Sequence, residues 1–480
     1  MNQWITPLYK AIKDHAGRNT ISFHVPGHKN GILMKNSPFN EDFLKMDVTE
    51  LTNLDDLHSP EGVIYEAEKL LASAFNAKRS FFLVNGSTVG NLAMLMATLQ
   101  EGDRVFIQRN CHKSILNGVE LSKAQPVLLG PENVEEWGVP GGVSIETIIR
   151  AYNLYPDCKA IVLTYPNYYG ITYGLEEIIH FAHSKGLLVL IDEAHGAHFK
   201  GGGFFPTSAI EFGADAVVQS AHKTLPAMTM GAYLHVNSNN ISPEMINHYL
   251  RILQSSSPSY PIMASLDLAR KYIATYSAED EKYLRAFIKD IREGLNQIDQ
   301  IKVLEYQNKQ GDPLKITIQS KCGYTGYELQ SMLEEQGIFT EMADPRNILL
   351  IIPLLKKGMD YPLDTILMKI KKAIARNSIP IKEETKELNY FKKSRISTIH
   401  NYQGQSMKEL PIGKANNYIC AETIIPYPPG IPFLLRGERI TEEDIKGLSL
   451  LLKSGARFQG GENLTNGSIK VYCKLEDNHE

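Results

Sequence analysis

Short apolar runs separated by helix-like segments are the feature of this sequence that most restricts its fold. The helix-like segments include Asn91–Leu99 and Glu176–Ser184, in which apolar residues recur at helical spacing. Strands that are buried on both faces and alternate with helices form parallel sheets. We therefore expect an α/β fold with a mainly parallel sheet flanked by helices. The expected strands are Ser80–Val84, Arg104–Gln108, Pro126–Leu129, Ala160–Thr164, Leu187–Ile191 and Ala216–Gln219, with Gly231–Val236 as a further strand at the edge.

The chain divides into three expected regions. Its 480 residues correspond to two or three domains at roughly 100–200 residues each. We expect an N-terminal arm at residues 1–62, a large domain at 63–300 that ends in long helix over 262–300, and a smaller α+β region at 301–480. That region should contain strands at Leu314–Ile318 and Ile348–Ile352, helices at Tyr327–Glu335 and Leu363–Arg376, and a polar surface crossing at 378–415.

Composition excludes several classes of protein. The net charge of -4 argues against a surface that neutralises nucleic-acid phosphates, and it gives no reason to expect binding to anionic membranes. The five cysteines are an odd number and form no CxxC pair, so we expect reduced thiols rather than disulfides or a zinc ribbon. The longest apolar runs are far too short to span a membrane. No signal peptide is evident at the N-terminus, and we expect a cytoplasmic enzyme.

The first candidate site element is the segment Val84–Asn91, VNGSTVGN. A strand stops, small and hydroxyl residues follow, and a helix begins. The N–H groups and dipole of a helix N-terminus hold phosphate, and Ser87 and Thr88 add hydroxyl donors. Taken alone, the segment is better explained as an ordinary helix N-cap.

The second element is Asp192, which follows an apolar run in LIDEAHG. A carboxylate there can pair with a protonated pyridine nitrogen, or it can simply cap the next turn. DEAH is also a helicase motif, but the sequence has no GxxxxGK[ST] string to hold nucleotide phosphates. Asp192, His195 and His198 are conceivable metal ligands, although no HExxH or comparable spacing supports this. We expect no metal.

The third element is Ser220-Ala221-His222-Lys223, directly after another apolar run. Lysine is almost never fully buried without a partner, and Schiff-base chemistry supplies a reason, because it needs an unprotonated amine in a desolvated place. Ser220 and His222 can reach a phosphate or a ring. A lone HK dipeptide more often marks a lysine whose amine reaches the surface. The order and spacing of the three elements together predict a pyridoxal 5'-phosphate (PLP) site.

Motifs across nearly the whole chain carry a family resemblance. They are TPLYKAI (6–12), FHVPGHKNG (23–31), LDDLHSPEG (54–62), RNCHKS (109–114), DEAHGAH (192–198), SAHK (220–223), SSSPSYPIMASLD (255–267), EMADPRNILL (341–350) and IPYPPGIP (425–432). The sequence resembles the ornithine/lysine/arginine decarboxylase family of fold-type-I PLP enzymes, in its short bacterial form, similar to biosynthetic arginine decarboxylase. The resemblance implies the fold of those enzymes, including a decarboxylase C-terminal domain at about residues 380–480.

The resemblance also implies roles for single residues. Lys223 would bind the cofactor covalently, Asp192 would pair with its pyridine nitrogen, Ala194 would pack near the ring, and His112 would stack on its face. Without the motif, His112 reads as an ordinary core or surface histidine. Ser87, Thr88, Ser220 and His222 would hold the phosphate, while Ser255 or Ser256 would reach the phosphate of the neighbouring subunit. Cys111 beside His112 is expected to pack behind the site, because neighbours in extended chain point to opposite faces.

The implied reaction is decarboxylation of arginine, lysine or ornithine to an amine that feeds polyamine synthesis, in a homodimer or modest oligomer with the site at the interface. Lys223 or His222 would return the proton. Glu341, Asp344 and Glu422 are candidates to bind the cationic end of the substrate, and each is otherwise a solvated carboxylate.

Alternatives remain open at the level of sequence. A transaminase or desulfurase shares the lysine, and Arg346, Arg436 or Arg439 would then grip the substrate carboxylate. An oxidase of basic amino acids and a catalytically silent PLP-binding regulator are further alternatives. Thr229-Met230 stands where many relatives have Ser/Thr-Gln, which leaves both the preferred substrate and the outcome of the reaction open.

Overall fold

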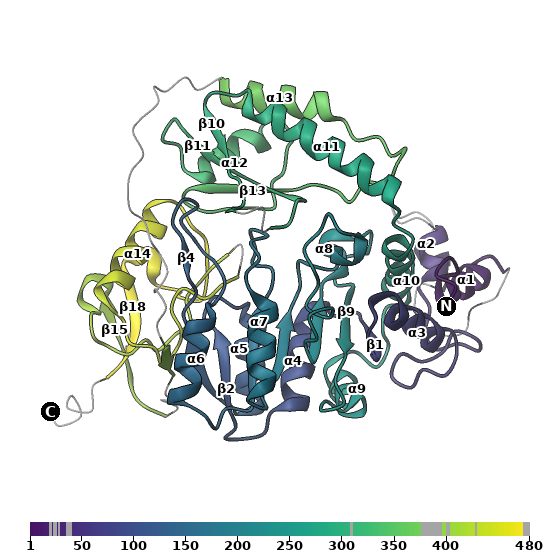
Figure 1. Cartoon of the computed structure of the whole chain (residues 1–480), viewed down its shortest axis with the longest axis horizontal. Coiled ribbons are helices and arrows are strands. Elements are labelled where there is room, and N and C mark those ends of the chain that lie inside the picture. Colours follow the sequence, from purple (N-terminus) through teal and green to yellow (C-terminus); the bar gives the residue numbers. More distant parts are fainter. Residues whose placement is uncertain are drawn as a thin grey trace.

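The computed structural model describes residues 1–18, 22, 26, 29–34, 41–307, 311–375, 396–399, 404–427 and 430–473. Parts of the motifs at 23–31 and 425–432 therefore lie outside the described residues. Figure 1 shows a central sheet with helices around it, a smaller layer of helices and strands above, and a C-terminal unit at the side opposite the N-terminus.

The central sheet has eight strands in the order β1-β9-β8-β7-β6-β2-β3-β14. Five neighbouring strands run parallel, namely β8, β7, β6, β2 and β3. At the two ends of this group, β9 pairs antiparallel with β8 and β14 pairs antiparallel with β3, and β1 pairs antiparallel with β9. The expected α/β fold with a mainly parallel sheet is confirmed. The bounds are β1 Arg79–Leu83, β2 Arg104–Gln108, β3 Gln125–Leu129, β6 Ala160–Thr164, β7 Leu188–Asp192, β8 Ala216–Gln219, β9 Ala232–Val236 and β14 Ile396–Thr398.

Helices cover both faces of this sheet, and the strand side chains divide between two cores. On β7, Val189 and Ile191 belong to one buried cluster and Leu190 to the other. Successive side chains on a strand point to opposite faces, so both faces must be apolar, and the strands read as continuous apolar runs. The surrounding helices are α3 Val63–Phe75, α4 Gly86–Thr98, α5 Lys113–Ser122, α6 Ile145–Leu154, α7 Leu175–Ser184 and α9 Pro243–Leu253, with β4 Asn133–Val134 and β5 Val139–Pro140 forming a small ribbon.

The long helix expected over 262–300 is divided into two. The structure has α10 Tyr260–Ala274 and α11 Ala278–Asn296. Ser277 begins α11 with a capping box, in which its side chain accepts from Asp280 N and Asp280 accepts from Ser277 N. Such a cap starts a new helix, and the S-x-x-D signal was present in the sequence.

A second, smaller sheet lies above the first in the order β10-β11-β13-β12, all antiparallel. Its strands are β10 Ile301–Val303, β11 Lys315–Ser320, β12 Met342–Ala343 and β13 Asn347–Ile351, and its helices are α12 Gly326–Glu334 and α13 Leu363–Ala375. The C-terminal unit has its own apolar core and contains β15 Met407–Pro411, β16 Ile425–Pro426, α14 Glu442–Lys453, β17 Phe458–Gln459 and β18 Ser468–Tyr472.

Residues 378–415 are not simply a surface crossing, because part of the segment is built into the large sheet. Within its described portion, β14 pairs with the outer edge of β3, with Ile396 opposite Leu129. Most of the remainder lies outside the described residues.

The N-terminal segment is packed against the body of the molecule. Helix α1 (Pro7–Ala16) buries Leu8 and Ile12, and α2 spans Glu41–Met46. Arg270 on α10, itself buried and paired with Asp267, donates to the Gln3 and Ile5 carbonyls. Within the part of the chain that the structure describes, no helix is long and apolar enough to cross a membrane.

Candidate active site

The predicted site residues meet at the carboxyl ends of the parallel strands, the edge at which open α/β sheets bind ligands. Asp192 is the last residue of β7, and Lys223 lies on the short helix α8 (Ala221–Thr224) just after β8. His112 caps the N-terminus of α5 after β2, and Ser87 lies in the first turn of α4 after β1. Residues far apart in the sequence are thus gathered by the parallel arrangement of the strands.

Asp192 is a buried carboxylate, 2% exposed. Its oxygens accept hydrogen bonds from Asn91 Nδ2 at 3.0 Å and from Ala194 N at 3.2 Å. Burial raises its pKa, whereas Lys223 and these hydrogen bonds lower it. Asn91 Oδ1 is buried and has no hydrogen-bond partner among the residues that the structure describes. Asn91 ends the candidate segment Val84–Asn91, but its contact with Asp192 was not predicted; its signal was a polar residue on the buried face of a helix.

Lys223 takes part in a chain of nitrogen atoms. Its Nζ lies 3.1 Å from His195 Nε2, and the other ring nitrogen of His195, Nδ1, lies 2.9 Å from Lys315 Nζ. Burial lowers the pKa of Lys223. The carboxylates of Asp192 and Glu341 raise it, but burial is the larger effect. Lys315 was missed in the sequence, where its signal was a lysine between the apolar residues Leu314 and Ile316 of an expected strand.

His112 is held in one orientation on the edge of the site. Its Nδ1 lies 2.8 Å from Ser114 Oγ and accepts from Ser114 N at 3.2 Å. A Cβ on Gly430 would lie 3.5 Å from the His112 ring, so the C-terminal unit approaches the ring closely. Burial, followed by Lys223 and Lys113, lowers the pKa of His112 to about 4, which keeps the ring neutral near neutral pH.

The phosphate candidates surround the start of α4. Ser220 Oγ donates to Ser87 Oγ at 2.8 Å, whereas Thr88 is exposed. Gly86 turns into the helix with a φ of +74°, and a Cβ on Gly90 would lie only 2.6 Å from Leu83. These glycines permit the tight turn and the close packing of helix on sheet that bring N–H groups to a ligand.

His222, also a phosphate candidate, has one ring nitrogen committed to the backbone. Its Nδ1 lies 3.0 Å from the Gly231 carbonyl, which can only accept. A neutral His222 therefore carries its proton on Nδ1, and Nε2 is left as the basic nitrogen. Burial lowers its pKa.

The three substrate candidates have different surroundings. Glu341 is exposed, and its charge affects the pKa values of Lys223 and Lys315, so it lies near the site. Asp344 is half-buried and accepts from Tyr169 Oη and Asn347 Nδ2. Glu422 accepts from the backbone N of Lys470 within the C-terminal unit.

The remaining predicted residues take no part in the hydrogen bonds described so far. Ser255 and Ser256 are exposed, and the Ser255 carbonyl is 2.7 Å from His58 Nε2. Cys111 is buried in the core, and burial raises its pKa to about 12, which disfavours a nucleophilic thiolate. The three arginines weighed for a transaminase have other contacts: Arg346 with Glu136, Arg436 with Tyr472 and Arg439 with Asn417.

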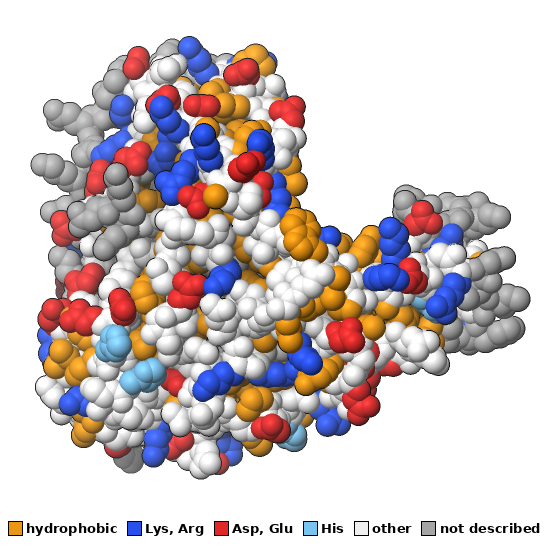
Figure 2. All heavy atoms as spheres, turned by 45° about the vertical axis from the view of Figure 1, so that its right-hand side comes forward, with side chains coloured by type: hydrophobic (Ala, Val, Ile, Leu, Met, Phe, Trp, Pro, Cys, Tyr) orange, Lys and Arg blue, Asp and Glu red, His pale blue; other side chains and the backbone are white. Residues whose placement is uncertain are grey.

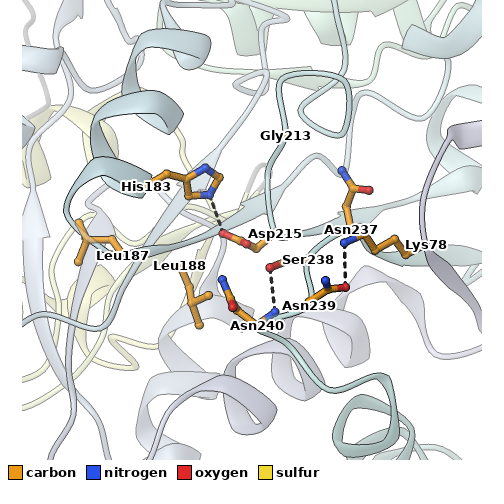
Figure 3. A pocket seen from close by; sticks show the side chains of 11 residues that line it. Lys78, His183, Leu187, Leu188, Gly213, Asp215, Asn237, Ser238, Asn239 and Asn240 are labelled. Carbon is orange, nitrogen blue, oxygen red and sulfur yellow. Dashed lines mark hydrogen bonds and ion pairs between the residues drawn. The ribbon is translucent and has the colours of Figure 1, made fainter.

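A polar recess of about 410 Å³ lies at the opposite end of the sheet. As Figure 3 shows, His183 points at Asp215, and the two are 2.9 Å apart. Asp215 also accepts from Val189 N at 2.8 Å, so it fixes the beginning of β7. The recess lies at the amino ends of β7 and β8, away from the cluster. Among the described residues, no group of histidine, cysteine or acidic side chains is arranged to hold a metal.

Comparison with known proteins adds to this geometry. Residues 6–311 match the model of the Orn/Lys/Arg decarboxylase major domain, and residues 384–474 match the corresponding C-terminal domain. The sequence is 45% identical to the uncharacterized protein YaaO of Bacillus subtilis (strain 168), over 98% of this chain and 99% of that protein. It is 34% identical to the arginine decarboxylase of the same strain, over 98% of each chain.

A solved structure supports the fold. The lysine decarboxylase LdcF of Francisella novicida superposes with a TM-score of 0.77 at 21% identity, over 98% of this chain and 81% of that chain. Together with the family match, this confirms the expected fold-type-I architecture with a smaller C-terminal domain.

Proposed function

The chain belongs to the Orn/Lys/Arg decarboxylase family, and from this premise we propose that it removes the carboxyl group of arginine, lysine or ornithine to release the corresponding amine. Membership makes it a PLP-dependent amino-acid decarboxylase. The observation that carries the proposal is that a buried carboxylate, Asp192, and a lysine of lowered pKa, Lys223, meet at the carboxyl edge of the sheet.

The side chains present fit PLP by their chemistry. The cofactor carries an aldehyde, a ring nitrogen that can be cationic and a phosphate. The site offers an amine of lowered pKa in Lys223, a buried carboxylate in Asp192, and the hydroxyls of Ser87 and Ser220 at a helix N-terminus. When bound, PLP supplies an electron sink that accepts the electrons left when CO2 departs.

Positioning of the cofactor is the task we assign to four groups. Asp192, held by Asn91, would keep the ring nitrogen protonated, and Lys223 would hold the aldehyde carbon. His112, neutral because its pKa is about 4, would cover one face of the ring without repelling its positive charge. The α4 N-terminus would hold the phosphate.

Proton return to the product is assigned to Lys223 Nζ, or to His222 Nε2 after that nitrogen has taken up a proton from solvent. The Gly231 carbonyl fixes the His222 ring and leaves Nε2 as its basic nitrogen. A general acid needs to reach the accepting atom within hydrogen-bond distance. Replacing His222 by glutamine should therefore slow turnover while leaving cofactor binding largely intact if this residue carries the proton.

Substrate recognition is assigned first to Glu341. Glu341 is exposed, and its negative charge raises the pKa of Lys223. A partner for the distant cation of a basic amino acid needs to be accessible and near the cofactor lysine in this way. Asp344 and Glu422 are less suitable, because local hydrogen bonds already occupy their carboxylates. Arginine is the first substrate to test, because a relative that is 34% identical is an arginine decarboxylase; the amine would feed polyamine synthesis.

The test is the product mass after incubation of the PLP-loaded protein with arginine, lysine and ornithine separately. Agmatine, cadaverine or putrescine would establish the reaction and its substrate. Lys223→Ala should abolish both the cofactor's bound absorbance and turnover. Keto-acid products or oxygen consumption would instead favour the transaminase or oxidase. The engagement of Arg346, Arg436 and Arg439 elsewhere argues against a transaminase.

A homodimer is the assembly that fits the exposed serines. Ser255 and Ser256 are exposed in one chain, as residues that serve a neighbouring subunit would be. Large apolar side chains are also exposed near the N-terminus, among them Trp4 at 68% and Leu33 at 75%. In Figure 2 apolar side chains gather where the surface is hollowed beside a projecting part. Such surfaces mark interaction sites, and light scattering of the intact protein tests the assembly.

A further inference from the structure

Lys315 is a buried lysine to which the proposed reaction gives no task. It lies on β11 of the smaller sheet and is fully buried. Its Nζ lies 2.5 Å from the Tyr168 carbonyl and 2.9 Å from His195 Nδ1. A buried lysine is costly unless it is paired, so its position at the site calls for a reason.

His195 connects Lys315 to Lys223 through its two ring nitrogens. Nδ1 faces Lys315 Nζ, and Nε2 faces Lys223 Nζ at 3.1 Å. Burial and the two lysines hold the pKa of His195 well below its ordinary value, so the ring is neutral. A neutral imidazole has one N–H donor and one acceptor nitrogen.

These contacts allow two arrangements of protons. In the first, Lys315 is an ammonium that donates to His195 Nδ1, and His195 Nε2–H donates to the lone pair of an unprotonated Lys223. In the second, Lys223 is the ammonium and Lys315 the free amine. Both hydrogen bonds are made when one lysine is charged and the other neutral.

We propose that Lys315 is a positioning residue that acts through His195 and holds the positive charge, so that Lys223 is an unprotonated amine when an aldehyde approaches. In passing between the arrangements, Lys223 Nζ gives a proton to Nε2 while Nδ1 gives its proton to Lys315 Nζ. Only N–H bonds form and break, and no electrons are gained or lost. The inference rests on the proposed function, because it assumes that Lys223 is the cofactor lysine.

The surroundings of Lys315 favour the charge there. An ammonium at Lys315 has two acceptors, Tyr168 O and His195 Nδ1, and the Asp312 carboxylate raises its pKa against the burial that lowers it to about 7. Asp192, the carboxylate that favours a charged Lys223, would be engaged by the ring nitrogen of a bound cofactor.

The titratable and charged groups that face the two lysines come from several elements. Those that bear on Lys223 are Asp192, Glu341, His195, His112, His222 and the Tyr168 ring, and those that bear on Lys315 are Asp312, Glu341, His195, Lys223 and Tyr306. Removing Lys315 deletes a positive charge and leaves the carboxylates in place, so the pKa of Lys223 should rise.

The test measures how readily Lys223 reacts at each pH. The full-length chain, freed of cofactor, is treated with trinitrobenzenesulfonate between pH 6 and 10, and modification of the Lys223 peptide is quantified by mass spectrometry. In Lys315→Met the midpoint should rise by about one pH unit, so that labelling below the midpoint falls roughly tenfold. Lys315→Arg keeps the positive charge and should retain the wild-type midpoint within about 0.3 units.

The matched control is Lys302→Met on the neighbouring strand β10, where Lys302 pairs with Glu136 at the surface at 3.0 Å; it should label as wild type. Circular dichroism checks folding, and Lys315→Gln, which keeps a donor for Tyr168 O, replaces the methionine variant if that variant does not fold. An unchanged midpoint in the neutral variants, or an equal shift in Lys315→Arg, would overturn the proposal. Labelling uses no substrate, so a shifted midpoint together with no amine product would refute the proposed function alone.

Discussion

The ion pair between Arg109 and Glu438 fastens the C-terminal unit to the large sheet beside His112. Arg109 directly follows β2, and its guanidinium donates to both Glu438 oxygens, at 3.3 and 2.8 Å. The same group donates to the Pro432 and Phe433 carbonyls at 2.8 and 2.9 Å. The Arg109 and Glu438 side chains are only 10% and 8% exposed. This contact anchors the segment that carries Gly430 over the His112 ring.

We predict that Arg109→Met will open this segment. Breaking a buried pair by removing one partner costs about 3–5 kcal/mol, because the other charge stays buried. Two carbonyls also lose their donors, at about 1 kcal/mol each if water does not replace them. Glu438 keeps a hydrogen bond from Leu435 N at 3.1 Å, so we expect a net cost of about 4 kcal/mol. The double variant Arg109→Met/Glu438→Leu should cost clearly less, because no unpaired charge remains.

Hydrogen exchange measured by mass spectrometry tests this locally. At about 1.4 kcal/mol per tenfold change in an equilibrium constant, peptides covering residues 430–440 should exchange several hundred-fold faster or more in Arg109→Met. The control is Arg104→Met on β2, since Arg104 pairs with Asp157 at the surface, where the side chains are 31% and 62% exposed. Such pairs are worth at most about 1 kcal/mol. An effect of Arg109→Met no larger than that of the control would refute the assigned role.

Three further predictions follow from other groups. Asp192→Asn should lower kcat by at least about 100-fold while cofactor absorbance is retained, and turnover within threefold of wild type would contradict the ring-nitrogen role. Glu341→Gln should raise KM for the basic amino acid more than it lowers kcat. An unchanged KM would show that Glu341 does not bind the substrate. Burial lowers the pKa of His235 to about 3. On acidification the unfolded chain binds a proton at this histidine near pH 6.5, whereas the folded chain does not. The free energy of unfolding should therefore fall by about 1.4 kcal/mol per pH unit between about pH 6.5 and 3. His235→Gln should reduce that slope in urea unfolding relative to the exposed control His180→Gln, and equal slopes would contradict the assignment.

Much of the fold was predictable from the sequence, because the apolar pattern of each segment agrees with the secondary structure that the segment forms. The runs at 104–108, 160–164 and 216–219 are strands with the predicted bounds, since a strand covered on both faces must be apolar at every position. The break between α10 and α11 was missed because both helices are apolar on one face, and only the capping box at Ser277 marks the boundary. The pairing of β14 with β3 was not predictable, because three residues in a polar segment carry no register signal.

The candidate site divides in the same way. Lys223, Asp192 and Ser87 were identifiable from the sequence, because chemically distinctive residues directly follow apolar runs, and parallel strands bring such ends together. Asn91, His195 as the neighbour of Lys223, and Lys315 depend on contacts between residues up to 120 positions apart. Asp344 and Glu422 looked equivalent to Glu341 until the structure gave their carboxylates other partners.

The sequence by itself determined the alternation of strands and helices, the edge of the sheet that carries the chemistry, and the family. These depend on periodicity and on residue types at short spacing, and both can be read from neighbouring residues in the sequence. Only the tertiary structure decided which side chains share protons, which carboxylates remain available, and how Arg109 joins the C-terminal unit to His112. Hydrogen bonds and ion pairs depend on distances of a few ångströms between distant segments, and packing of the whole chain sets those distances.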